Sequence, residues 1–112
     1  MRDDKLYLIH IRESIERIET YLADRDREEF LASTLIQDAV LRNLQALAES
    51  TQRLPPSWKE KHSEVDWAKI SGFRNVLTHD YLGIDLARVW NIIERDLPGL
   101  KRTIEEMLKE ST

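Results

Sequence analysis

Apolar residues recur at helical spacing over the first part of the chain. Five of them follow one another in alternating steps of three and four: Leu8, Ile11, Ile15, Ile18 and Leu22. Such steps place the side chains on one stripe of an α-helix, and charged residues fill the rest of its surface. The pattern predicts a helix over residues 3–22, followed by a short polar connection at residues 24–27.

A second periodic segment runs from Glu28 to about Ser50 without an internal Gly or Pro, so we expect one uninterrupted helix there. Its apolar residues wrap more than one face, as in a helix that is covered on two sides. One cover is the protein core, and a partner subunit is a candidate for the other. The prolines at 55 and 56 end the segment, and a short helical turn capped by Ser57 is expected after them.

The second half of the chain predicts two further helices. Asp66 is a suitable N-cap for a helix with Ile70, Phe73 and Leu77 on its apolar side. After a stop at residues 83–85, helical phase resumes at residue 86 and continues to residue 108, with an interruption expected at Pro98-Gly99. The sequence therefore predicts an all-α fold, an antiparallel bundle of four main helices plus one short helical turn, formed by a single domain over residues 1–112.

The composition agrees with one small helical domain. The chain has 112 residues, of which 41% are hydrophobic and 34% charged, with three Gly and three Pro. It has no cysteine, which excludes disulfides, thiolate zinc sites and a cysteine nucleophile. The net charge of −4 does not attract nucleic acid, so any RNA contact has to be local. No signal segment or long apolar run is present, and we expect a soluble cytoplasmic protein without a membrane partner.

Candidate chemistry is concentrated at Arg74, His79 and Tyr81. Arginine presents a fork of donors to phosphate oxygens, histidine exchanges a proton near neutral pH, and tyrosine offers a hydroxyl group. Together they could cleave RNA without a metal ion or another cofactor. His79 would move the proton of a ribose 2′-hydroxyl or of the leaving oxygen, and Arg74 would offset the charge that develops on the phosphate.

Helix geometry sets a condition for this hypothesis. At about 100° per residue, a straight helix places His79 roughly 140° around the axis from Arg74, whereas Arg74, Thr78 and Tyr81 share one stripe. The catalytic interpretation requires that the helix ends or distorts near His79, or that a second subunit completes the site. On the residues alone, Arg74 could equally form a border salt bridge and His79 cap the helix end.

The segment Arg74-Asn75-Val76-Leu77-Thr78-His79-Asp80-Tyr81 resembles the signature of HEPN-domain proteins, and the chain is similar to the HepT family. The similarity extends over most of the chain, including residues 39–44, 71–75, 81–85 and 89–90. HepT proteins are the toxins of bacterial HepT/MntA type VII toxin–antitoxin pairs. The resemblance implies a metal-independent endoribonuclease that is active as a homodimer, with two motifs along a shared cleft.

The resemblance also assigns roles to individual residues. Arg74 and His79 would be catalytic, with Asn75 as a polar helper. The cognate antitoxin, an MntA-like minimal nucleotidyltransferase, would attach AMP to Tyr81 or bind without modifying it. The family tends to carry Gly-Glu-Ala near the end of the second helix, where this chain reads Leu47-Ala48-Glu49-Ser50. Glu49 could orient Arg74 or His79, but its position on the helix favours a solvent-facing residue.

Other residues favour structural roles. Trp67 and Trp90 are expected in the core or in a dimer contact, and Trp58 is open. His10 and His62 lack acidic neighbours at ligand spacing on a shared helical face, so we expect surface positions and no metal site. Two functions compete with the nuclease hypothesis. One is a non-catalytic module that pairs with a nucleotidyltransferase or binds a nucleotide, and the other is a helical oligomerisation domain.

Overall fold

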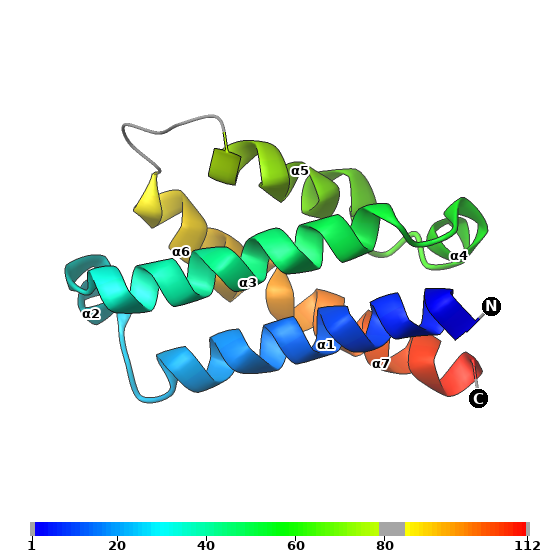
Figure 1. Cartoon of the computed structure of the whole chain (residues 1–112), viewed down its shortest axis with the longest axis horizontal. Coiled ribbons are helices and arrows are strands. Elements are labelled where there is room, and N and C mark those ends of the chain that lie inside the picture. Colours follow the sequence, from blue (N-terminus) through cyan, green and yellow to red (C-terminus); the bar gives the residue numbers. More distant parts are fainter. Residues whose placement is uncertain (1, 79–84, 112) are drawn as a thin grey trace.

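Seven helices make up the part of the chain that the computed structural model describes, with no strand among them. That part comprises residues 2–78 and 85–111, with side chains from residue 4 to 74 and from 85 to 111. The helices are α1 (Arg2–Leu22), α2 (Arg27–Ala32), α3 (Thr34–Gln52), α4 (Pro56–Lys61), α5 (Trp67–Thr78), α6 (Leu86–Arg95) and α7 (Leu97–Glu110). Helices α1, α3, α5 and the α6–α7 pair run alternately in opposite directions (Figure 1), which confirms the predicted all-α antiparallel bundle.

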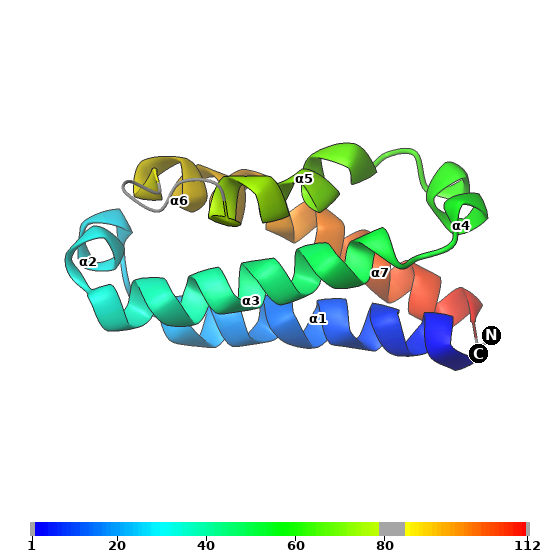
Figure 2. The same ribbon diagram turned by 45° about the horizontal axis from the view of Figure 1, so that its top comes forward.

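The bundle is elongated, measuring 41 × 29 × 22 Å, and its core runs along the long axis. Helix α1 packs against α3 and α7, and α3 also packs against α5, so α3 is covered on two sides within one chain. Figure 2 shows α3 between α1 and α5. The core contains the predicted apolar stripes; its fully buried side chains include Leu8, Ile11, Ile15, Ile18, Leu44, Leu47, Leu100 and Ile104. None of the described helices is long and apolar enough to cross a membrane.

The expectation of one uninterrupted helix over residues 28–50 is wrong, because the helix is interrupted at Ser33. Its backbone is extended, with φ −115° and ψ 106°, so Ser33 ends α2 and begins α3. The serine hydroxyl accepts a hydrogen bond from the backbone N–H of Ile36 at 3.2 Å. The Gln37 amide donates to the carbonyls of Phe30 and Leu31, at 2.9 and 3.0 Å. These side chains replace the hydrogen bonds that a continuous helix would make, which lowers the cost of the break.

The break allows α2 to cover one end of the core. Helix α2 is fixed by a capping box, in which Asp26 accepts from the Glu29 N–H at 2.9 Å and Glu29 accepts from the Asp26 N–H at 3.2 Å. Phe30 is completely buried, and its ring lies 5.6 Å from that of Trp90, centroid to centroid. Trp90 and Trp67 are both buried within the single chain, which agrees with the first of the two alternatives, a core position rather than a dimer contact.

The other helix boundaries follow the sequence closely. Asp66 accepts from the Lys69 N–H at 3.1 Å, as expected of an N-cap. The last helical segment is interrupted at Asp96, two residues before Pro98, which lies in the first turn of α7. Helix α4 begins at Pro56 rather than after a Ser57 cap, because proline at the first helical position needs no amide donor.

The predicted surface position of His62 is wrong, whereas that of His10 is confirmed. His10 is exposed on α1. His62 is only 7% exposed, although it lies in the short connection after α4. Its neighbours are Glu64, in the same connection, and Glu110 on α7. Neither lies with His62 on one face of a single helix, so helical spacing in the sequence does not identify them. Trp58 is half-buried against the core.

Candidate functional site

Arg74 lies exposed on α5, beside the C-terminal end of α3. One guanidinium nitrogen, Nη1, donates to the side-chain oxygen of Gln52 at 3.5 Å. The amide nitrogen of Gln52 in turn donates to the backbone carbonyl of Ser71 at 3.4 Å. Gln52, the last residue of α3, therefore connects this helix to both the backbone of α5 and the Arg74 side chain. The Arg74 residue as a whole remains exposed at the surface.

Helix α5 is held on two sides, which fixes the position of the Arg74 backbone. Ile70 and Phe73 are each 3% exposed and anchor the apolar side of the helix in the core. On another side, the Lys69 ammonium group lies 3.2 Å from the Asp96 carboxylate, at the junction of α6 and α7. Arg74 follows Phe73 directly, so it lies about 100° around the axis, at the border of the buried face.

The remaining residues of the motif lie at or beyond the end of α5. Asn75 and Thr78 belong to this helix, but their side chains are outside the described part of the structure. His79 and Tyr81 also lie outside the described residues. The convergence of Arg74 and His79 on one phosphate-sized space therefore stays a prediction.

Glu49 and Gln52 occupy neighbouring positions on α3. Glu49 is exposed, in agreement with its interpretation as a solvent-facing residue. Residues three apart on a helix lie on the same side, so Glu49 is close in direction to the residue that contacts Arg74. Gln52 itself was missed by the sequence analysis. Its contact with Arg74 spans 22 positions in the sequence. The one sequence signal for Gln52 is that it lies three residues after Glu49, on the same side of the helix.

The comparison with family models gives one match, to ribonuclease HepT-like proteins, over residues 11–107. The matched region contains α3, α5 and the whole segment from Arg74 to Tyr81. It covers most of the chain, and its helices form the bundle described above. The chain belongs to the HepT-like ribonuclease family, as its resemblance predicted.

Individual relatives agree with this assignment. A Methanocaldococcus jannaschii protein, named as a gamma-glutamylcyclotransferase and candidate RNase, is 37% identical over 97% of this chain, which spans 49% of that relative. A second protein of this organism, named as a candidate RNase, is 35% identical over 93% of this chain and 95% of its own length. The probable ribonuclease HepT of Thermococcus cleftensis is 34% identical over 96% of this chain and 98% of its own length. No solved structure matches the chain.

Proposed function

We propose that this chain is the toxin of a toxin–antitoxin pair and cleaves RNA without a metal ion. The observation that carries this proposal is the family match over residues 11–107, which includes the complete Arg74–Tyr81 segment. The exposed guanidinium of Arg74 supports it, because a cationic fork at the surface can bind the phosphate of a bulky RNA chain. With a net charge of −4, the protein would contact RNA at this local site rather than through its whole surface.

In the proposed reaction, His79 transfers a proton and Arg74 stabilises negative charge, with Asn75 and Gln52 in supporting roles. His79 takes the proton of a ribose 2′-hydroxyl as the 2′-oxygen forms a bond to phosphorus, and the bond from phosphorus to the leaving oxygen breaks. The leaving oxygen then receives a proton. Arg74 stabilises the charge on the non-bridging phosphate oxygens, and Asn75 acts as a polar helper. Gln52 restricts the rotation of Arg74, which would keep the guanidinium oriented before RNA binds.

A second copy of the chain is part of the proposed active state. The motifs of two subunits would lie along one cleft, so that the partner supplies part of each site. Leu35 on α3 is 81% exposed in the single chain, so its side chain is available for such a contact. Helices α3 and α5 are antiparallel, so the C-terminal end of α5 is directed toward the end of the bundle at which α3 begins (Figure 1).

We also propose that a minimal nucleotidyltransferase controls the toxin through Tyr81. The Tyr81 oxygen would attack the α-phosphorus of ATP, and pyrophosphate would leave. The attached AMP adds a negative phosphate group near Arg74, which would occupy the cation and repel the RNA backbone. Inhibition by binding alone is the simpler variant of the same control. Both would act in the cytoplasm, where the toxin meets its RNA.

The direct test is RNA cleavage by the purified full-length chain in the presence of EDTA. We expect defined RNA fragments to accumulate, because no step of the proposed reaction uses a divalent metal. A gel of end-labelled RNA, with and without EDTA, measures the rate. Activity that appears only with added magnesium or manganese would contradict the metal-independent mechanism.

Replacing Gln52 with Ala is expected to lower kcat for RNA cleavage by about 2- to 10-fold, the range that corresponds to one ordinary hydrogen bond. The reason is the loss of the Gln52 oxygen that accepts from Arg74 at 3.5 Å. Gln52→Glu keeps an acceptor oxygen and should restore most of the rate. Gln45→Ala, on the exposed surface of the same helix, is the matched control. An unchanged kcat in Gln52→Ala would remove this residue from the positioning of Arg74.

The net charge of −4 also favours a second candidate, a non-catalytic module that pairs with a nucleotidyltransferase or binds a nucleotide. Arg74 and Tyr81 would then be recognition groups. In this case RNA stays intact in the cleavage assay, while incubation with the transferase and ATP adds the mass of one AMP to Tyr81. Fragmented RNA together with that adduct would favour the toxin.

A further inference from the structure

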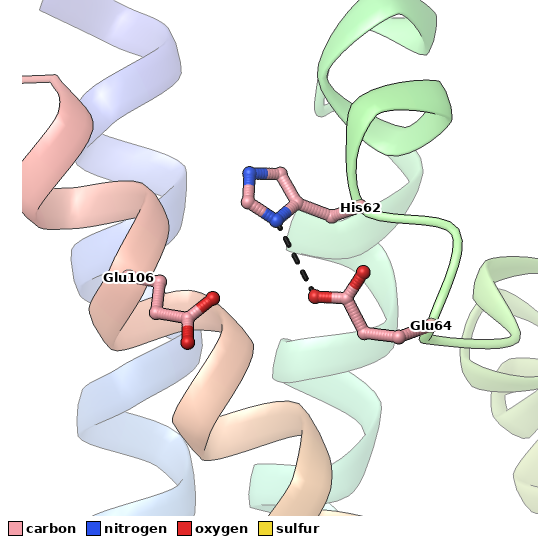
Figure 3. Close-up of side chains that lie close together, drawn as sticks. All are labelled: His62, Glu64 and Glu106. Carbon is pink, nitrogen blue, oxygen red and sulfur yellow. Dashed lines mark hydrogen bonds and ion pairs between the residues drawn. The ribbon is translucent and has the colours of Figure 1, made fainter.

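A cluster of one histidine and three glutamates joins the connection after α4 to the end of α7. Nδ1 of His62 lies 3.4 Å from Oε2 of Glu64, and Nε2 lies 2.9 Å from Oε1 of Glu110. Glu106, one turn before Glu110 on α7, directs its carboxylate toward the same space (Figure 3). One ligand atom each from His62, Glu64 and Glu106 lie within 4.8 Å of one another.

The two ring nitrogens of His62 have different surroundings. A neutral imidazole carries one N–H, and with that proton on Nε2 the ring donates to Glu110. Nδ1 then presents a lone pair toward the Glu64 carboxylate, an arrangement that needs a positive charge between the two groups. Carboxylate oxygens lie 3.4 Å from Nδ1 and 2.9 Å from Nε2, so the surroundings of the ring favour a cation beside Nδ1.

We propose that Nδ1 of His62 and the carboxylates of Glu64 and Glu106 form a site for a divalent zinc ion, with water as the fourth ligand. Nitrogen and oxygen ligands about 2.0–2.1 Å from zinc, at tetrahedral angles, are about 3.4 Å apart. The distance from His62 Nδ1 to Glu64 Oε2 already has this value. Glu64 and Glu106 are exposed, so small side-chain rotations bring all three ligands to one ion.

The groups around the cluster are arranged as they commonly are around metal ligands. A ligating histidine usually donates its other N–H to a carboxylate, and ligating carboxylates are themselves hydrogen-bonded. Here Glu110 accepts from Nε2 of His62, and the hydroxyl of Thr103 donates to Glu64 at 3.3 Å. Thr103 is only 4% exposed, so its position is fixed by the core.

A zinc ion at this position would link two parts of the chain that are distant in sequence. His62 and Glu64 lie in the connection between α4 and α5, and Glu106 lies on α7. The backbone carbonyl of His62 also accepts from the indole N–H of Trp67 at 2.9 Å, so this connection fixes the first residue of α5. The site is at the opposite end of α5 from the motif. Zinc is therefore expected to stabilise the fold rather than to take part in RNA cleavage.

The test uses the full-length chain after treatment with a chelator, titrated with zinc chloride by calorimetry and followed by thermal unfolding. We expect one zinc ion per chain and an unfolding midpoint that rises with zinc concentration, since zinc binds only the folded site. Glu106→Gln should weaken zinc binding at least about tenfold, a loss that even residues orienting a ligand produce. Because Glu106 is exposed, this variant should fold normally without zinc.

Glu105→Gln is the matched control, with the same charge change at the next exposed position of α7. It should bind zinc as the unmodified chain does. The ¹⁵N resonance of His62 Nδ1 should shift on zinc addition, while that of exposed His10 stays in place. Equal zinc affinity in Glu106→Gln and the unmodified chain, or a shift only at another histidine, would overturn the proposal. None of these measurements depends on RNA cleavage.

Discussion

Replacing His79 with Ala is expected to lower the rate of RNA cleavage by at least about 100-fold, while the helical circular dichroism spectrum stays unchanged. A positioned general acid or base contributes about 10²- to 10⁴-fold to a reaction rate, and His79 is the proposed proton carrier. Initial rates on end-labelled RNA, measured with EDTA present, test this expectation. The effect should fall on kcat more than on KM, because Arg74 would still bind phosphate.

His10→Ala is the matched control for this experiment. His10 is exposed on α1, so its loss removes an imidazole without affecting the core. Its cleavage rate should equal that of the unmodified chain. If His79→Ala and His10→Ala both cleave RNA at the original rate, His79 has no part in the mechanism and the proposed proton transfer is wrong.

Replacing Phe30 with Ala is expected to lower the free energy of unfolding by about 3–5 kcal/mol, the usual cost of removing a fully buried aromatic ring. Phe30 is completely buried and lies 5.6 Å from the Trp90 ring, so truncation leaves a cavity beneath α2. Because native domains are stabilised by only about 5–15 kcal/mol, this loss is a large part of the total. Unfolding in guanidinium chloride, followed by circular dichroism, measures the change.

Leu6→Ala separates the effect of burial from that of removing any large apolar side chain. Leu6 is 47% exposed on α1, and its truncation should cost no more than about 1 kcal/mol. A similar small loss in Phe30→Ala would mean that α2 does not pack on the end of the core as described. The two variants therefore test whether the interruption of the helix at Ser33 allows α2 to pack on the end of the core through Phe30.

Several helix boundaries could be predicted because their signals are local. Asp66 caps α5 as expected, and the interruption before Pro98 follows from the geometry of proline. The break at Ser33 could not be predicted in the same way, since serine occurs both within helices and at their ends. What decides the outcome is that Ser33 and Gln37 supply the missing hydrogen bonds, and that Phe30 becomes buried in the core.

The candidate site could be predicted only as far as its residues are close in sequence. The motif identified Arg74, and the structure places it exposed on α5. The partner of Arg74, Gln52, is 22 positions away, and the contact of His62 with Glu110 spans 48 positions. Such contacts depend on how helices pack against one another, which helical periodicity within one segment does not specify.

The N-terminal end of α1 and the C-terminal end of α7 lie together at the end of the bundle where α4 lies, away from the C-terminal end of α5 (Figure 1). An affinity tag or fluorescent protein joined at either end would therefore lie away from the C-terminal end of α5, where the motif begins. Fusion at either end should leave access to that segment open. The same fusions could disturb the neighbourhood of Glu110, so tags should be cleaved before zinc is titrated.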